Sequence, residues 1–324
     1  MVKLASAEMA EKKLATRAAF GATLAELAEE GVPVVAVDAD LTGSTTTKKF
    51  AAAAPENADK LFNCGIAEQN MIDVAAGLAL TGHVAYTGSF AVFGTGRAYD
   101  QIRNTVCYSN LDVKICPTHA GVSVGPDGGS HQMLEDVSLM RGLPNMRVLV
   151  PADYAAARAA IKLAAKTPGP VYVRMGRAAV PCVYDDDVEL EIGRAYVLRE
   201  GSNATVVACG VEIREALAAA DMLAEEGVSI EVIDAFSVKP LDEDTITASV
   251  AKTGCCVVAE EHSVHGGLGS AVAECLARKN PAPCEFVGVQ DRFGKSGEFE
   301  ELLGYFNLDA AAIVEAVKCA RGRK

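Results

Sequence analysis

One carboxylate in this chain has surroundings that could give it a chemical role. Glu68 lies at the start of an apolar stretch that the sequence predicts to be a helix over 66–81, ended by Gly82. Few polar residues follow Asp73, so we expect this helix to be buried on most sides. Acids also suit helix N-termini because of the unpaired N–H groups and the helix dipole. Position alone therefore indicates a cap, and any catalytic role depends on neighbouring groups.

Two later segments supply groups that could act together with this acid. Phe90 and Phe93 follow a short predicted strand, and a glycine-rich loop then carries His119, Asp127 and His131. Open α/β sheets place their ligand sites in loops that follow strands. A histidine there can move a proton near neutral pH, and a buried acid can share one with a bound ring. The residue types therefore indicate a site that binds an organic ring and transfers protons.

The elements that must position these groups alternate in type along nearly the whole chain. The predicted helices cover 14–30, 66–81, 97–108, 154–165, 213–226 and 269–277. The predicted strands cover 32–37, 83–86, 113–116, 147–150, 169–174, 205–209, 229–233 and 255–259. Continuous apolar strands are typical of a sheet that is covered on both faces. The pattern predicts an α/β fold with mostly parallel sheets and helices on both faces.

The composition changes near the middle of the chain, where Asp185, Asp186 and Asp187 interrupt the alternation. We take 181–192 as an interdomain linker between a first domain at 1–180 and a second at 193–324. A chain of 324 residues is long enough to hold two such domains, each with a substantial core.

Composition excludes some classes of partner. A formal net charge of −13 argues against nucleic acid, whose binding needs a basic face. No apolar run has the length of a membrane span, and we expect no signal peptide at the N-terminus. The ten cysteines lie mostly in apolar runs and none are spaced Cys-x-x-Cys, so we expect them to be structural. Such thiols fit a cytoplasmic protein.

The order and spacing of six segments resemble the pyrimidine-binding domain of thiamine diphosphate enzymes, and transketolase most closely. The resemblance covers the chain from about Ala15 onward, and its segments are 15–17, 38–44, 65–70, 97–101, 119–131 and 149–153. It implies that Glu68 is the acid that activates the cofactor and that Phe90 and Phe93 stack on its pyrimidine. It also implies that Asp40 lies near the cofactor at a subunit interface.

The same resemblance implies a set of substrate contacts. Asp127 would recognise a hydroxyl of the donor sugar, and His131 would contact its C1 hydroxyl and carbonyl oxygen. His119 would hold the acceptor near its phosphate end. The phosphate-binding positions correspond to Arg17, Ser44 and Arg174, with Arg177 as an alternative to Arg174; His262 and His265 match a motif that we expect to be structural.

A motif of the family is missing from the chain. It has no Gly-Asp-Gly sequence, which in the family belongs to the domain that binds Mg²⁺ and the diphosphate. The resemblance therefore implies the C-terminal subunit of a split transketolase, without metal ligands of its own. A separate N-terminal subunit would hold Mg²⁺ or Ca²⁺, in an α2β2 heterotetramer that moves a two-carbon ketol group between sugar phosphates. The isolated chain would be dimeric and inactive.

Two alternatives remain open from the sequence. The string at 65–69 also occurs in deoxyxylulose-phosphate synthase and in the β subunit of 2-oxo acid dehydrogenases, which decarboxylate a 2-oxo acid. Asp127, His131 and the position of His119 favour transketolase over both. The chain could also be a non-catalytic assembly subunit, against which the intact Glu68, Asp127 and His131 argue.

Overall fold

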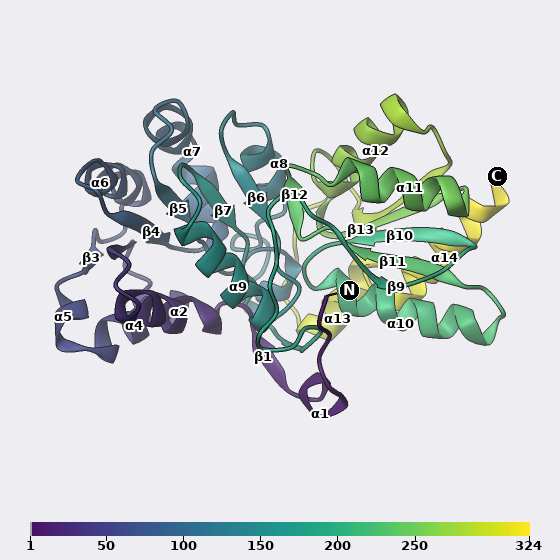
Figure 1. Ribbon diagram of the computed structural model, residues 1–324, viewed down its shortest axis with the longest axis horizontal. Helices are drawn as coiled ribbons and strands as arrows, with labels where there is room; N and C mark the ends of the chain where they lie inside the picture. The colour runs from purple at the N-terminus through teal and green to yellow at the C-terminus, as the bar shows by residue number, and fades with distance from the viewer. Residues whose placement is uncertain (1) are drawn as a thin grey trace.

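The computed structural model describes residues 2–324, which form two lobes lying side by side (Figure 1). Each lobe is built on a mostly parallel sheet with helices on both faces, so the predicted fold class is confirmed. None of the helices formed by the described residues is long and apolar enough to cross a membrane.

The first sheet has seven strands in the order β12-β6-β7-β5-β4-β2-β3. Six of them pair in parallel, and β12, which comes from the second half of the chain, pairs antiparallel with β6. A strand of the second lobe therefore completes the edge of the first sheet, where it lies between the lobes in Figure 1. The strands are β2 (Val34–Asp38), β3 (Leu61–Asn63), β4 (Val84–Gly88), β5 (Val113–Ile115), β6 (Arg147–Leu149), β7 (Val171–Val173) and β12 (Ser237–Lys239).

Alternation along the buried strands divides the core of this lobe in two. Val34 and Ala36 belong to the cluster formed with α2 and α9, whereas Val35 and Val37 belong to the cluster formed with α6 and η2. The helical elements are α1 (Ala7–Ala10), α2 (Ala18–Glu29), α3 (Thr42–Thr45), α4 (Thr47–Ala53), α5 (Pro55–Ala58), α6 (Glu68–Leu80), η1 (Val92–Arg97), α7 (Tyr99–Gln101), η2 (Ile102–Cys107), η3 (Val122–Asp127), α8 (Asp136–Arg141) and α9 (Tyr154–Ala165).

The second sheet has five strands in the order β14-β13-β10-β11-β9, with only β9 antiparallel. Helices α10 and α14 pack on one face, and α11 and α12 on the other. The elements are β9 (Tyr196–Arg199), β10 (Ala204–Ala208), α10 (Glu212–Glu225), β11 (Ile230–Asp234), α11 (Glu243–Thr253), β13 (Cys256–Ser263), α12 (Leu268–Lys279), β14 (Cys284–Val289), α13 (Phe299–Phe306) and α14 (Ala310–Gly322).

Three local predictions are corrected by the structure. The helix predicted from residue 14 begins at Ala18, because β1 (Lys13–Ala15) pairs antiparallel with β8 (Ala179–Pro181). In place of the helix predicted over 97–108, the chain forms the π-helical segment η1 from Val92, a turn at Ala98, the short helix α7 and the π-helical segment η2, which ends at Cys107. Helix α6 is not buried on most sides, since it presents an exposed stripe that ends at Leu80.

The linker between the lobes, residues 181–192, makes hydrogen bonds and core contacts with both of them. Asp153, the N-cap of α9, accepts hydrogen bonds from the backbone N–H groups of Val183 (2.6 Å) and Tyr184 (2.8 Å). The Tyr184 hydroxyl then donates to Asp234 at the end of β11, at 2.5 Å. Val188 and Leu190 are buried in the common core. These contacts fix the path of the chain between the two sheets.

Candidate functional site

The residues with possible chemical roles gather at one edge of the first sheet. Strands β2, β3, β4 and β5 are parallel neighbours, so the segments after their carboxyl ends meet there. Phe90 follows β4, His119 follows β5, Asp40 follows β2, and Glu68 follows β3. An additional bridge joins Phe90 to Thr118 and extends the pairing of β4 with β5 into these segments.

Glu68 begins helix α6 with its side chain 2% exposed. The Ser89 hydroxyl lies 3.5 Å from Oε1, and Nη1 of Arg97 donates to Oε2 at 2.7 Å. The Arg97 side chain is 47% exposed and lies over the Phe93 ring, 4.5 Å from its centroid. The acid is therefore buried under a cation that can move toward solvent.

Two aromatic rings and two histidines form one packed group beside this acid. The Phe90 and Phe93 rings are stacked with centroids 6.2 Å apart, and the His119 ring stacks on Phe90 at 3.8 Å. His131 meets the Phe93 ring edge-on at 5.4 Å. Phe90 is buried, whereas Phe93 and His131 are partly exposed, so the group forms one wall of a site that opens to solvent.

The environment of His119 keeps its ring neutral. Burial lowers its pKa to about 3, and the charges of Arg17, Arg177 and His131 act in the same direction. Its Nδ1 lies 2.7 Å from the Thr118 hydroxyl, and its backbone has a positive φ of 60°. A neutral imidazole in this position can exchange hydrogen bonds with a ligand, but it cannot serve as a cationic acid.

Two arginines approach each other beyond His119. Nη1 of Arg17 donates to the backbone oxygen of Ser44 at 2.7 Å, and Nη1 of Arg177 donates to that of Val124 at 2.7 Å. Both line a cavity of about 300 Å³ together with Ser123. Burial lowers the pKa of Arg17, and the charge of Arg177 lowers it further. Two cations that repel one another favour a shared dianionic ligand such as a phosphate.

Arg174, which the sequence predicts to bind phosphate, does not lie with this pair. Its side chain is 7% exposed, and Nε donates to Asp136 at 2.7 Å. Nη2 donates to the backbone oxygen of Glu261 at 2.9 Å. Burial alone would lower the pKa of Arg174, but the charges of Asp136 and Glu261 outweigh it and raise this pKa, and the guanidinium is held between the two domains. The candidate phosphate contact therefore moves from Arg174 to Arg177.

The two predicted aspartates lie at the rim of the site. Asp40 is exposed with a positive φ of 64°, and its N–H donates to the Asn63 side chain at 3.1 Å. Asp127 is exposed at the end of η3, four residues before His131. Both carboxylates are thus available to a ligand or to a partner.

The residues present fit one end of thiamine diphosphate. A pyrimidine ring needs an acid at one nitrogen and an aromatic surface, which Glu68 and the Phe90–Phe93 pair supply. No group of three potential metal-binding side chains occurs among residues 2–324.

Sequence reasoning missed two of the contacts in this site. Arg97 was within a matching segment, but the π-helical turns of η1 shift the direction of its side chain relative to an α-helix. Ser123 was inside the recognised loop, and its place beside Arg177 depends on how that loop folds back. An arginine that follows the sequence Phe93-Gly94-Thr95-Gly96 gives no signal in itself.

Two family models match the chain in succession. The one described as "Transketolase, pyrimidine binding domain" matches residues 12–183, and the one described as "Transketolase, C-terminal domain" matches residues 193–313. Together they account for both lobes of the structure.

Similar proteins are found along nearly the full length. The chain is 44% identical over 304 residues to a protein of Methanocaldococcus jannaschii named as a transketolase C-terminal section, covering 93% of this chain and 94% of that protein. It is 42% identical over 301 residues to a 6-deoxy-6-sulfo-D-fructose transketolase subunit of Clostridium sp. (strain MSTE9), covering 93% and 92%. A solved structure described as a split gene transketolase, inactive β4 tetramer, matches with a TM-score of 0.87 and 48% identity, covering 96% of this chain and 99% of that one.

Proposed function

Because the chain belongs to the transketolase family, we propose that it is the C-terminal subunit of a two-subunit transketolase that uses thiamine diphosphate. The observation that carries this proposal is an incomplete site: a buried acid beside an aromatic wall, and no cluster of metal ligands among residues 2–324. A separate N-terminal subunit would supply the metal and the groups that bind the diphosphate.

Each residue has a definite task in this proposal. Thiamine diphosphate, when bound, supplies a nucleophilic ring carbon that can accept and release a two-carbon ketol unit. Glu68 shares a proton with the pyrimidine, and its burial favours a proton held between acid and ring over one exchanged with water. Phe90 and Phe93 stack on that ring and exclude water. Arg97 must release the Glu68 carboxylate to make room.

Residues beside this aromatic group contact the sugar substrates in the proposal. His131, which is partly exposed beside Phe93, moves a proton at the donor's hydroxyl or carbonyl oxygen. Asp127 accepts a hydrogen bond from a donor hydroxyl, and neutral His119 positions the acceptor. Arg17 and Arg177 bind the phosphate in the cavity between them.

The proposal also specifies the class of sugar that the enzyme uses. We propose a ketose phosphate as donor and an aldose phosphate as acceptor, because two arginines suit a dianion. The sulfo-sugar named for the Clostridium relative shows that another anionic group can be used within the family. A sulfonate carries one charge less than a phosphate, so both anions are included in the test.

An assay of the reconstituted enzyme tests the proposal. The chain would be mixed with the N-terminal subunit, thiamine diphosphate and Mg²⁺, and then given xylulose 5-phosphate with ribose 5-phosphate. Parallel mixtures would contain 6-deoxy-6-sulfo-fructose with an aldose phosphate, or pyruvate with glyceraldehyde 3-phosphate. Ketol transfer without release of CO₂ supports the proposal. Decarboxylation of pyruvate would favour the synthase-like alternative, and no turnover in any mixture would favour an assembly subunit.

The relative solved as an inactive β4 tetramer supports one further part of the proposal. We propose that this chain, like that one, associates with itself when the other subunit is absent and is then inactive. With the N-terminal subunit it would form an assembly with two copies of each chain and twofold symmetry.

A further inference from the structure

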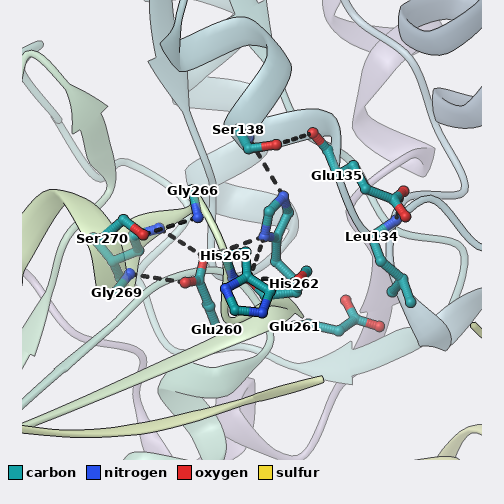
Figure 2. A network of polar contacts seen from close by, with 12 residues as sticks. Leu134, Glu135, Ser138, Glu260, Glu261, His262, His265, Gly266, Gly269 and Ser270 are labelled. Atoms are coloured by element: carbon teal, nitrogen blue, oxygen red, sulfur yellow. Dashed lines mark hydrogen bonds and ion pairs between the residues drawn. The ribbon is translucent and has the colours of Figure 1, made fainter. Parts of the chain in front are cut away.

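A buried polar network joins the second domain to the loop that carries Asp127 and His131. Its centre is the end of β13, where Glu260, Glu261 and His262 follow one another (Figure 2). The two carboxylates point in opposite directions in Figure 2, with Glu260 toward Gly269 and Glu261 toward the first domain. All three side chains are at most 3% exposed.

Glu261 caps a helical segment that belongs to the other domain. Its Oε1 accepts the backbone N–H of Ser123, in the first turn of η3. The N-cap position of η3 is Gly121, which has a φ of 78° and no side chain to cap the turn. A Cβ on Gly121 would lie less than 3 Å from the Glu261 carboxyl group. A carboxylate from the second domain thus replaces the side-chain cap that the loop lacks.

A second segment of the same domain supports the rest of the loop. Residues 294–297, between β14 and α13, lie against three loop glycines so closely that a Cβ on Gly128 or Gly129 would come within 3 Å of them. Nε2 of Gln132 donates to the backbone oxygens of Lys295 at 2.9 Å and of Val122 at 3.1 Å. The loop is therefore shaped from both ends by the second domain.

Glu261 is itself held rigidly. Its Oε2 lies 3.7 Å from Nη1 of Arg174, which is also paired with Asp136. His262 Nε2 accepts from the N–H of Ser138 at 3.4 Å, and its Nδ1 lies 2.7 Å from the Ser263 backbone oxygen. Donation from Nδ1 to that oxygen leaves Nε2 free to accept, so both contacts are satisfied by neutral imidazole.

We propose that Glu261 is a positioning residue for the reaction, through which the second domain holds residues 121–131 in the conformation that presents Asp127 and His131 to the donor sugar. This inference rests on the proposed function for its consequence in catalysis. Its structural part, the control of the loop by a carboxylate of the other domain, can be measured without any turnover.

The experiment compares three variants of adjacent residues. Glu261→Ala removes the cap, whereas Glu261→Gln keeps an oxygen that can accept from Ser123. Glu260→Ala is the matched control, because that carboxylate caps Leu268 and Gly269 at the start of α12 within the second domain. Hydrogen exchange on the isolated chain would follow residues 121–132, with α9 as an internal reference.

Glu261→Ala should exchange at least tenfold faster over 121–132, Glu261→Gln should fall between it and the wild type, and Glu260→Ala should leave this loop unchanged. In the assembled enzyme, Glu261→Ala should raise the KM for the donor ketose about tenfold while the Kd of thiamine diphosphate changes less than twofold. The inference would be overturned if residues 121–132 exchanged at the wild-type rate in Glu261→Ala. It would also be overturned if Glu260→Ala accelerated their exchange as much as Glu261→Ala does. A wild-type complex without ketol transfer would refute the proposed function instead, and the exchange result would still stand.

Discussion

The Glu68 carboxylate has two competing partners in this structure. Arg97 holds it at 2.7 Å in the free subunit, whereas the proposed cofactor needs the same carboxyl group at its pyrimidine. The Arg97 side chain is 47% exposed and can return to solvent, but the Glu68 carboxylate is only 2% exposed, so the pair separates at low cost only when another group takes over the buried acid. The arginine can therefore protect the buried acid until the site is completed.

Replacing Glu68 by Gln should leave the fold intact and lower turnover of the assembled enzyme by about 10²–10⁴-fold, because an amide has the shape of the acid but cannot share its proton. Steady-state assays at saturating thiamine diphosphate measure this loss. Glu56→Gln is the control, since Glu56 is an exposed acid in the first turn of α5. Near-normal turnover of Glu68→Gln would contradict the assignment.

Arg177→Ala and Arg17→Ala should each raise the KM for phosphorylated sugars about tenfold or more, since a charged hydrogen bond contributes roughly 1.5–3 kcal/mol. The KM for unphosphorylated sugars should hardly change.

Arg174→Ala should instead lower the Tm of the chain, because it leaves Asp136 buried without its cation. A folded Arg174→Ala variant with a phosphate-specific KM defect would show that the phosphate contact lies at Arg174.

The sequence predicted which residue types meet at this site better than it predicted their partners. Glu68, Phe90, His119 and His131 each follow a parallel strand or lie in the loop after one, so chain order was enough to bring them together. The choice between Arg174 and Arg177 depends on the contact of Arg174 with Glu261 in β13, which lies 87 residues further along the chain. No local pattern carries that information.

At the scale of elements, α6 has an exposed face that needs an explanation. Leu80, at its C-terminal end, is 73% exposed, and Asp73 and Gly77 are exposed before it; Ile66, two residues before the helix begins, is 79% exposed. The spacing of Asp73, Gly77 and Leu80 places them on one stripe of the helix. A mixed stripe with a small central residue permits close approach of another helix, so we expect α6 to contact a second chain.

Gly77→Arg should weaken assembly at least tenfold while leaving the isolated chain as stable as before or slightly more stable. A Cβ at Gly77 meets nothing within 4 Å, and glycine disfavours helix by about 1 kcal/mol. Gly322→Arg is the matched control, because Gly322 is an exposed helical glycine with equally open surroundings in the second domain. Sedimentation would report the assembly, and unchanged association of Gly77→Arg would exclude this face.

Asp234, which accepts a hydrogen bond from Tyr184 of the linker, makes the stability of the folded chain depend on pH. Burial raises the pKa of Asp234 to about 7, with the charge of Asp153 acting in the same direction and the hydrogen bond from Tyr184 opposing it. The folded chain thus keeps a proton that the unfolded chain releases above about pH 4. Stability from this group is therefore lost as the pH rises from about 4 to 7.

Asp234→Asn removes this titration while keeping the side chain's size. The Tm of the wild type should fall relative to that of the variant between pH 5 and pH 8, and the difference should level off above the folded pKa. Thermal melts of both proteins across this range measure the effect. A constant difference would mean that Asp234 is ionised in the folded chain throughout.

Elements were predictable where the chain supplies a long local pattern. Helix α9 has the predicted bounds because Asp153 caps an uninterrupted alanine-rich run. Three-residue strands such as β1 and β12 were missed, since each exists only through its pairing with a distant segment. The π-helical turns of η1 and η2 were missed for a related reason, because their extra residue per turn is set by packing and not by composition.

At the scale of the whole molecule, both sheets share continuous core clusters, one on each face. Strand β12 and the Glu261 network make further connections between the lobes. The two domains therefore act as one body, whereas the proposed cofactor site is completed by a different chain. Assembly, and not closure of one domain on the other, is then the step that creates an active site.

The last prediction concerns this assembly. The purified chain alone should associate with itself and show no ketol transfer, and activity should appear only when the N-terminal subunit is added. Thiamine diphosphate and Mg²⁺ bridge the two kinds of chain in the proposal, so they should tighten the complex by linkage, by about 2.7 kcal/mol at a cofactor concentration 100 times its Kd. Sedimentation with and without the cofactor measures this shift, and Glu68→Gln should reduce it. Catalysis by this chain alone would refute the split-enzyme proposal, while cofactor-independent affinity would place the cofactor outside the interface.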